Sequence, residues 1–284
     1  MKIANYDIYT IEAGRFRLDG GAMFGIIPKP LWNKKIDSDD NNKINLTLRC
    51  LLLKSDNKNI LIDTGIGNKF DNKEKSIFQV CHSKSSLESS LNELGLSKYD
   101  ITHVILSHLH FDHAGGATER DDMGNLNPSF PNAVYYIQRK NLEWALNPSD
   151  KDRKSYLKED IQPIIEQNKL KILSGDVDLF PNIKLLVING HTVGQQMVKI
   201  SDKNTTLLYC ADLIPTTSHL SPHWIMAYDL YPLKSIEEKK NILLKAYNKN
   251  WILFFDHDPN IEACTIKHNE DNFSVNEVFS FKIK

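Results

Sequence analysis

Hydrophobic and polar residues alternate along the first part of the chain in the pattern of β-strands. Residues 6–19 (YDIYTIEAGRFRLD) alternate and then stop at two glycines, which predicts a strand with one buried face. Two apolar runs, residues 46–55 and 58–65, are joined by a turn-forming SDNKN sequence and predict a hairpin. Residues 22–32 are also apolar, but Pro28 and Pro30 interrupt them, which favours a loop.

Two later segments have the period of amphipathic helices. From Ser85 the leucines fall at positions i, i+4 and i+7, Ser85 and Glu88 match a capping box, and Gly95 suits the C-terminal stop. A second Ser-x-x-Glu sequence at Ser235 predicts the start of a helix that continues through Tyr247. Both helices are short enough to cover part of a sheet.

The remaining apolar runs predict buried strands that alternate with helices. A polar stretch with helical character, residues 139–167, is expected to be an excursion from the core. No short-period repeat, low-complexity tract or linker divides the sequence, so residues 1–284 are expected to form a single domain. The strands are predicted at residues 102–107, 133–138, 183–190, 195–201, 205–212 and 251–257.

Composition and charge limit the classes of function. The 284 residues have a hydrophobic fraction of 41%, a formal net charge of −1 and a pI of about 6.8, which argue against binding to nucleic acid or anionic lipid and favour a small-molecule substrate. The N-terminus has no apolar signal segment and no run approaches the ~20 apolar residues of a membrane span, so a cytoplasmic protein is expected. The four cysteines show no CxxC spacing and are expected to be reduced.

The sequence SHLHFDHAGG concentrates metal-binding side chains directly after a predicted strand. Side chains two positions apart share a face of an extended segment, so His108 and His110 can bind one ion. Asp112 and His113 can then face a neighbouring ion. The small residues at 114–116 allow the backbone to approach the site closely.

Three more candidate ligands, His191, Asp212 and His257, also lie at the ends of predicted strands. Five imidazoles and two carboxylates form a nitrogen and oxygen set that suits zinc, with manganese, iron or cobalt as alternatives. The expected cofactor is therefore a pair of divalent ions. One ion is assigned to His108, His110 and His191, the other to Asp112, His113 and His257, with Asp212 as the bridge.

The order of these motifs resembles that of the metallo-β-lactamase superfamily, whose H-x-H-x-D-H motif is matched by residues 108–113. The resemblance implies an α+β fold, a four-layer αββα sandwich. Residues 18–32 and 211–232 are most similar to bacterial lactonases that open N-acyl-homoserine lactones. Several of those lactonases carry a tyrosine shortly after the bridging aspartate, whereas Leu213, Ile214 and Pro215 stand here. The other matching motifs are LIDTG, GHTVG, ADL and FDHD at residues 61–65, 190–194, 211–213 and 255–258.

The ligand set and the resemblance together imply a dinuclear-metal hydrolase that opens a lactone ring. A metal-bridging hydroxide would attack the ester carbonyl, and Asp112 is expected to orient the water and to pass a proton to the departing alkoxide. A phosphotriesterase or arylesterase would use the same site, so this alternative stays open. A glyoxalase-II-like thioesterase is less favoured because no basic cluster near the C-terminus suits glutathione. A scaffold protein without chemistry would be expected to have lost some of the seven ligands.

The substrate pocket is expected to lie beside the ions. The candidate lining residues come from the predicted loop and from the segment after Asp212, and ordinary core packing is the alternative for each of them. Asp63 is expected to cap turns beneath the site rather than to bind metal. A homodimer is left open. The candidate lining residues are Met23, Phe24, Ile26, Trp32, His219, Trp224 and Met226.

Overall fold

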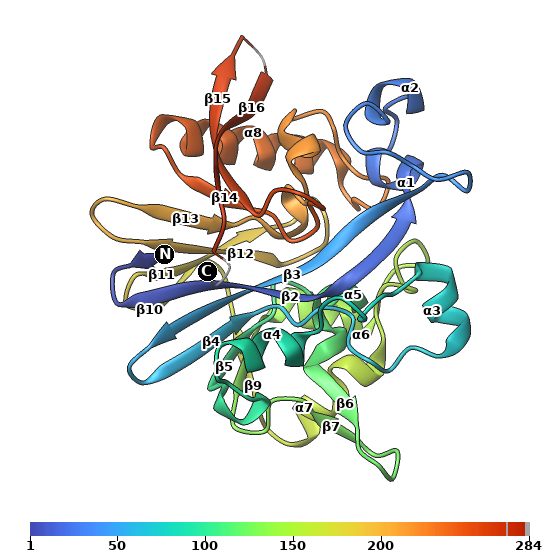
Figure 1. Ribbon diagram of the computed structural model, residues 1–284, viewed down its shortest axis with the longest axis vertical. Helices are drawn as coiled ribbons and strands as arrows, with labels where there is room; N and C mark the ends of the chain where they lie inside the picture. The colour runs from blue at the N-terminus through green and yellow to red at the C-terminus, as the bar shows by residue number, and fades with distance from the viewer. Residues whose placement is uncertain (271, 282–284) are drawn as a thin grey trace.

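The computed structural model describes residues 1–270 and 272–281, which form two seven-stranded sheets stacked face to face (Figure 1). In the first sheet the strands lie in the order β1, β2, β3, β4, β5, β8, β9. The first four are antiparallel, whereas β5, β8 and β9 continue parallel to β4. They span Lys2–Ile3 (β1), Tyr6–Asp19 (β2), Lys43–Ser55 (β3), Lys58–Ile62 (β4), His103–Ile105 (β5), Val134–Gln138 (β8) and Leu170–Leu173 (β9).

The second sheet contains β10 to β16 in sequence order. Its neighbours are antiparallel except for β13 and β14, which run parallel. A separate two-stranded ribbon, β6 (Thr118–Arg120) and β7 (Leu126–Pro128), extends away from the sheets (Figure 1). The strands of the second sheet span Val177–Phe180 (β10), Ile183–Ile188 (β11), Gln195–Ser201 (β12), Thr206–Tyr209 (β13), Ile252–Phe254 (β14), Ala263–Asn269 (β15) and Asn272–Phe279 (β16).

Helices cover the outer faces of both sheets, so the predicted four-layer αββα sandwich is confirmed. Figure 1 shows α8 on the side of the second sheet and α4 to α7 on the side of the first. The helices span Gly20–Phe24 (α1), Lys29–Trp32 (α2), Asn72–Phe78 (α3), Leu87–Glu93 (α4), Phe111–Ala114 (α5), Arg139–Leu146 (α6), Gln162–Glu166 (α7) and Pro232–Asn248 (α8).

A hydrophobic core fills the space between the sheets. Ile62 and Ile105 from the first sheet pack in the same buried cluster as Val198 and Phe254 from the second. Burial of such side chains stabilises the fold by about 1.5–3 kcal/mol each. Two further apolar clusters bury the outer faces of the sheets under the helices.

The predicted hairpin is confirmed, because β3 and β4 pair with Ser55 opposite Lys58. The predicted loop at residues 22–32 is wrong in part, because α1 and α2 occupy it. The Asp19 side chain caps α1 by accepting a hydrogen bond from the backbone N–H of Ala22. Pro30 lies in the first turn of α2, where its missing N–H leaves no hydrogen bond unmade.

The predicted capping box at Ser85 and Glu88 is wrong by one residue. Ser86 caps α4, since its Oγ accepts a hydrogen bond from the backbone N–H of Ser89, and the Ser89 hydroxyl accepts one from the backbone N–H of Ser86. A short hydroxyl side chain therefore takes the place that the sequence pattern assigned to a carboxylate.

The second predicted capping box is also wrong, because α8 begins three residues earlier, at Pro232. Proline suits the first helical position since its ring fixes φ and its missing N–H is not needed there. Ser235 lies buried inside the helix. Glu238 instead accepts hydrogen bonds from the backbone N–H groups of Asn189 and Gly190, which lead into one of the candidate ligands.

The segment predicted as a helical excursion contains α6, a 3-10 turn at Lys158–Asp160 and α7, with an irregular stretch at 147–157. The buried Asp152 holds this stretch by accepting hydrogen bonds from Trp144 Nε1 and Ser149 Oγ, both at 2.7 Å. Among the described residues, no helix combines the length and the apolar character needed to cross a membrane.

Candidate metal centre

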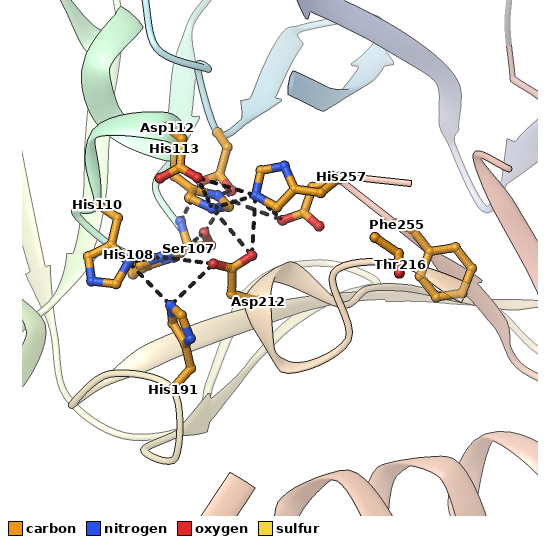
Figure 2. Close-up of polar contacts among 12 residues, drawn as sticks. Ser107, His108, His110, Asp112, His113, His191, Asp212, Thr216, Phe255 and His257 are labelled. Atoms are coloured by element: carbon orange, nitrogen blue, oxygen red, sulfur yellow. Dashed lines mark hydrogen bonds and ion pairs between the residues drawn. The ribbon is translucent and has the colours of Figure 1, made fainter. Parts of the chain in front are cut away.

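All of the predicted ligands come together at one end of the sandwich (Figure 2). His108 and His110 follow β5, and Asp112 and His113 lie in the short helix α5. The other three follow strands of the second sheet: His191 after β11, Asp212 after β13 and His257 after β14. Both sheets therefore contribute, and the site lies where the carboxyl ends of these four strands meet.

Three imidazoles form a first group with one oxygen of Asp212. Nδ1 of His110 lies 3.0 Å from Nε2 of His108 and 3.2 Å from Nε2 of His191. Asp212 Oδ2 lies 3.2 Å from Nε2 of His191 and 3.8 Å from Nε2 of His108. Ligand atoms at the corners of a tetrahedral zinc site with bonds of about 2.0–2.1 Å are separated by about 3.3 Å. The first group has the spacing of such a site.

A second group surrounds the other oxygen of Asp212. Nε2 of His113 and Nε2 of His257 lie 3.2 Å apart, and Asp212 Oδ1 lies 3.5 and 3.3 Å from them. Asp112 Oδ2 lies 3.4 Å from His257 Nε2 and 3.8 Å from His113 Nε2. Asp212 thus presents one oxygen to each group, which is the geometry of a bridging carboxylate.

The outer nitrogens of these rings determine which nitrogen carries a lone pair toward the centre. Nδ1 of His257 donates to the backbone oxygen of Thr47 at 2.8 Å, and a carbonyl oxygen can only accept. Nδ1 of His191 lies 2.9 Å from Asp229 Oδ1, and Nδ1 of His113 lies 2.9 Å from Asp63 Oδ2. Carboxylate or carbonyl partners of this kind fix the tautomer of metal-binding histidines. The lone pairs of the inner Nε2 atoms then point toward one another. A cation placed between them stabilises this arrangement.

Several buried polar atoms near these groups have no hydrogen-bond partner among the described residues. They include Asp212 Oδ1 and both carboxylate oxygens of Asp256. Asp256 is 1% exposed, lies 3.7 Å from His113 Nδ1 and falls in the second group. Because a buried unpaired carboxylate is costly, the residues present fit a site that binds positive charge.

Burial and charge shift the pKa values of the imidazoles in opposite directions. Burial lowers the pKa of His110 to about 3, and positive charge on His191 adds to this effect. For His191, burial also favours the neutral form, but the carboxylates of Asp212 and Asp229 outweigh burial and raise the pKa to about 9. The carboxylates of Asp212 and Asp229 therefore favour positive charge beside them.

Asp63 supports the site from below, as expected. Its carboxylate accepts hydrogen bonds from the backbone N–H and the hydroxyl of Ser107 at 2.6 and 2.7 Å, and from the Tyr209 hydroxyl at 2.9 Å. The same carboxylate binds His113, so one side chain orients a candidate ligand and the start of the histidine-rich loop. The predicted close backbone approach after His113 is also present: a Cβ at Gly116 would lie 2.2 Å from the backbone oxygen of Thr64.

A cavity of about 330 Å³ opens beside the two groups. Candidate ligands border it on one side, and apolar side chains including Leu18, Phe78 and Phe111 border it on another. Met23 and Met226 line it, as predicted from the sequence. A polar part of the lining comes from the irregular stretch at 151–155.

The other predicted lining residues do not border this cavity. Phe24 stacks between Trp32 and His219, with ring centroids 5.3 and 4.8 Å away, and meets Trp224 edge-on at 5.8 Å. These aromatic rings pack against one another and not against the cavity. Ile26 is 92% exposed on the surface. The sequence identified the correct segments but not which of their side chains face the cavity.

His219 has a structural role that predicts a pH effect. Its Nε2 donates to the Met23 backbone oxygen at 2.8 Å, and burial lowers its pKa to about 4. Since this value lies below the unfolded pKa of about 6.5, the neutral ring contributes fully above pH 6.5. That contribution, about 3 kcal/mol, is lost as pH falls toward 4.

Denaturant unfolding of wild type and His219→Gln, both in the presence of chelator, between pH 7 and pH 4 measures this effect. The stability advantage of wild type over the variant is expected to shrink by about 3 kcal/mol across the range. Parallel pH dependence in the two proteins would show that His219 is not buried as a neutral ring.

Sequence reasoning missed two buried carboxylates, Asp229 and Asp256. Asp229 orients His191 from a position 38 residues away, and nothing in its local sequence signals that contact. Asp256 directly precedes His257 in FFDHDP, where the prediction assigned only the histidine. The alternation of a strand would have pointed the two side chains to opposite faces, but Asp256 lies beyond the end of β14.

The same fold occurs in known proteins. A family model described as "Metallo-beta-lactamase superfamily" matches residues 49–257. An N-acyl homoserine lactonase from Bacillus cereus is 30% identical over 263 residues, which cover 88% of this chain and 92% of that protein. Residues 49–257, which the family model matches, contain both groups of candidate ligands.

Two solved structures extend the similarity to three dimensions. A probable metal-dependent hydrolase from Staphylococcus aureus has 30% sequence identity and a TM-score of 0.88, covering 100% of this chain and 99% of that one. A variant of AiiA from B. thuringiensis, with N-decanoyl-L-homoserine bound at the active site, has 26% identity and a TM-score of 0.69, covering 91% and 95%.

Proposed function

Because the chain belongs to the metallo-β-lactamase superfamily, we propose that it is a dinuclear-metal hydrolase that opens the lactone ring of N-acyl-homoserine lactones. The convergence of five imidazoles around the two oxygens of Asp212, at the border of a cavity, is the main support. The names of the relatives support the substrate class. Zinc is the ion that the spacing and the nitrogen and oxygen donors suit best.

Two ions held by these side chains would supply a water-derived nucleophile at neutral pH and would polarise the ester carbonyl. His108, His110 and His191 would hold one ion, and His113, His257 and Asp112 the other, with Asp212 shared. The partners on the outer nitrogens, Asp229, Asp63 and the Thr47 carbonyl, hold the proton of each neutral ring on Nδ1, so that Nε2 is the atom that would bind the ion.

Asp112 is the residue to which we assign the proton transfer. Its carboxylate lines the cavity and lies 3.4 Å from His257 Nε2. Burial favours its protonated form, but the positive charge of His113 and the contact with His257 outweigh burial and lower its pKa. Addition of the water oxygen to the carbonyl carbon opens the C=O double bond, and the ring C–O bond breaks when the C=O bond forms again. The proton released from water passes through Asp112 Oδ2 to the ring oxygen, so that the products are a carboxylate, an alcohol and one proton in solution.

The shape and charge of the cavity favour a neutral substrate with an apolar chain. Met23, Phe111 and Met226 offer an apolar surface beside the candidate ligands. An acyl chain can lie against this surface while the lactone carbonyl faces Asp212. No basic groove is required for such a substrate, in agreement with the net charge of −1.

An assay panel on purified, metal-analysed protein tests the proposal. The panel contains N-acyl-homoserine lactones of increasing chain length, an aryl ester, a phosphotriester and a glutathione thioester, with proton release or chromophore release as the signal. We expect the highest kcat/KM for an acyl-homoserine lactone. A phosphotriester or thioester with a kcat/KM at least about tenfold higher would assign the site to a different reaction.

A further inference from the structure

One wall of the cavity is the segment 226–229, which also supports the metal centre. Met226, Ala227 and Tyr228 line the cavity. The next residue, Asp229, is buried and binds His191 Nδ1 at 2.9 Å. The position of this short segment therefore affects both the shape of the substrate cavity and the orientation of a candidate ligand.

Lys151 joins this wall to the polar stretch at 151–155, which also lines the cavity. Its ammonium group donates to the backbone oxygens of Ala227, Tyr228 and Asp229 at 2.8, 2.9 and 3.0 Å. An ammonium group has three N–H bonds, so all of its donors are used on three successive carbonyls. Lys151 itself lines the cavity, in the stretch that Asp152 anchors. Lys154 also lines the cavity, but it makes no hydrogen bond or ion pair with the residues that the structure describes.

The Tyr228 hydroxyl is a free donor at this place. Within the described part of the chain it has no hydrogen-bond partner, although its ring forms part of the wall. Burial raises the pKa of Tyr228 to about 12, and the negative charges of Asp112, Asp19 and Asp212 act in the same direction. The hydroxyl therefore stays protonated at any working pH, and it belongs to a residue that lines the same cavity as the candidate metal ligands.

We propose that the Tyr228 hydroxyl donates a hydrogen bond to the carbonyl oxygen of the bound ester, and that Lys151 is a positioning residue that holds Tyr228 in place for this contact. The assignment rests on the proposed ester hydrolysis at the adjacent centre. A donor aimed at a carbonyl oxygen on which negative charge develops stabilises the transition state. The clamp on three consecutive carbonyls fixes the backbone from which this donor projects.

A double-mutant cycle tests the proposal on the best substrate of the assay panel. Tyr228→Phe keeps the ring and removes the donor, so kcat/KM is expected to fall on the order of 10- to 100-fold. Lys151→Met keeps the length of the side chain and removes the clamp, with an expected loss of about tenfold. If Lys151 acts through Tyr228, the double variant is expected to fall within about twofold of Tyr228→Phe alone. Lys151→Arg, which can still donate to carbonyls, is expected to recover most of the activity.

Lys158→Met is the matched control, because it removes a positive charge from an exposed position in the same segment without bordering the cavity. Metal content, measured in every variant, is expected to stay at the wild-type value. Wild-type activity in Tyr228→Phe, multiplicative losses in the double variant, or metal loss in Lys151→Met would each overturn the proposal. If wild type does not hydrolyse the lactones, the assay panel shows this without any variant. The double-mutant cycle is then run on the ester that wild type does hydrolyse.

Discussion

Replacement of Asp212 by alanine is expected to abolish hydrolysis of every ester substrate and to lower the bound metal at the same time. Asp212 places Oδ2 within 3.2 Å of the first group and Oδ1 within 3.3 Å of the second. Without this carboxylate, both groups lose a ligand and the negative charge that offsets two cations. A loss of kcat/KM of at least about a thousandfold, or roughly 4 kcal/mol of transition-state stabilisation, is expected.

Elemental analysis and kcat/KM measured on the same preparations check this expectation. Asp178→Ala is a suitable control because Asp178 is an exposed aspartate of β10, in the same sheet but away from the site. Asp212→Asn separates charge from shape, since the amide keeps the volume and one acceptor oxygen. An Asp212→Ala protein with wild-type activity, or with two bound ions per chain, would contradict the bridging assignment.

Asp63→Ala is expected to cause the largest loss of stability of any single change beneath the site. Three hydrogen bonds to Ser107 and Tyr209 and one to His113 would lose their acceptor. Buried donors left unpaired cost about 1–3 kcal/mol each. Asp63 also has a φ of 59°, a left-handed conformation that alanine adopts less readily than aspartate or asparagine. The free energy of unfolding is expected to fall by about 4 kcal/mol or more.

Denaturant unfolding and metal titration of Asp63→Ala and Asp63→Asn measure this effect. Asparagine tolerates the left-handed backbone and keeps one acceptor oxygen, so an intermediate stability is expected for it. Metal affinity is expected to fall about 10- to 100-fold in the alanine variant, because His113 loses the partner that orients it. An Asp63→Ala protein within about 1 kcal/mol of wild type would show that the carboxylate does not support the site.

The layers of the fold and the candidate ligands could be predicted because their signals are local. The alternation over residues 6–19 predicts the whole of β2 from one stretch of sequence. Four ligand residues fall within six positions after β5. His191, Asp212 and His257 each follow a run of branched or aromatic residues that is typical of a buried strand. Side chains at strand ends converge when the strands belong to facing sheets, so local patterns were sufficient here.

Contacts between distant segments could not be predicted in the same way. Asp229 reaches His191 from the loop before α8, and Lys151 donates to three carbonyls about 76 to 78 residues further along the chain. The sequence around each of these two residues looks like that of an ordinary surface segment. Phe24 and Trp32 have the composition of a pocket wall, but they stack on each other. Which face of an aromatic side chain is buried depends on partners that only the fold brings together.

A crystal structure of the zinc-loaded protein, with anomalous scattering measured at the zinc absorption edge, is the most direct test of the central assignment. We expect two anomalous peaks per chain, one among His108, His110 and His191 and the other beside His113 and His257, with Asp212 between them. A single peak, or zinc bound elsewhere while these imidazoles stay without metal, would contradict a two-ion hydrolase.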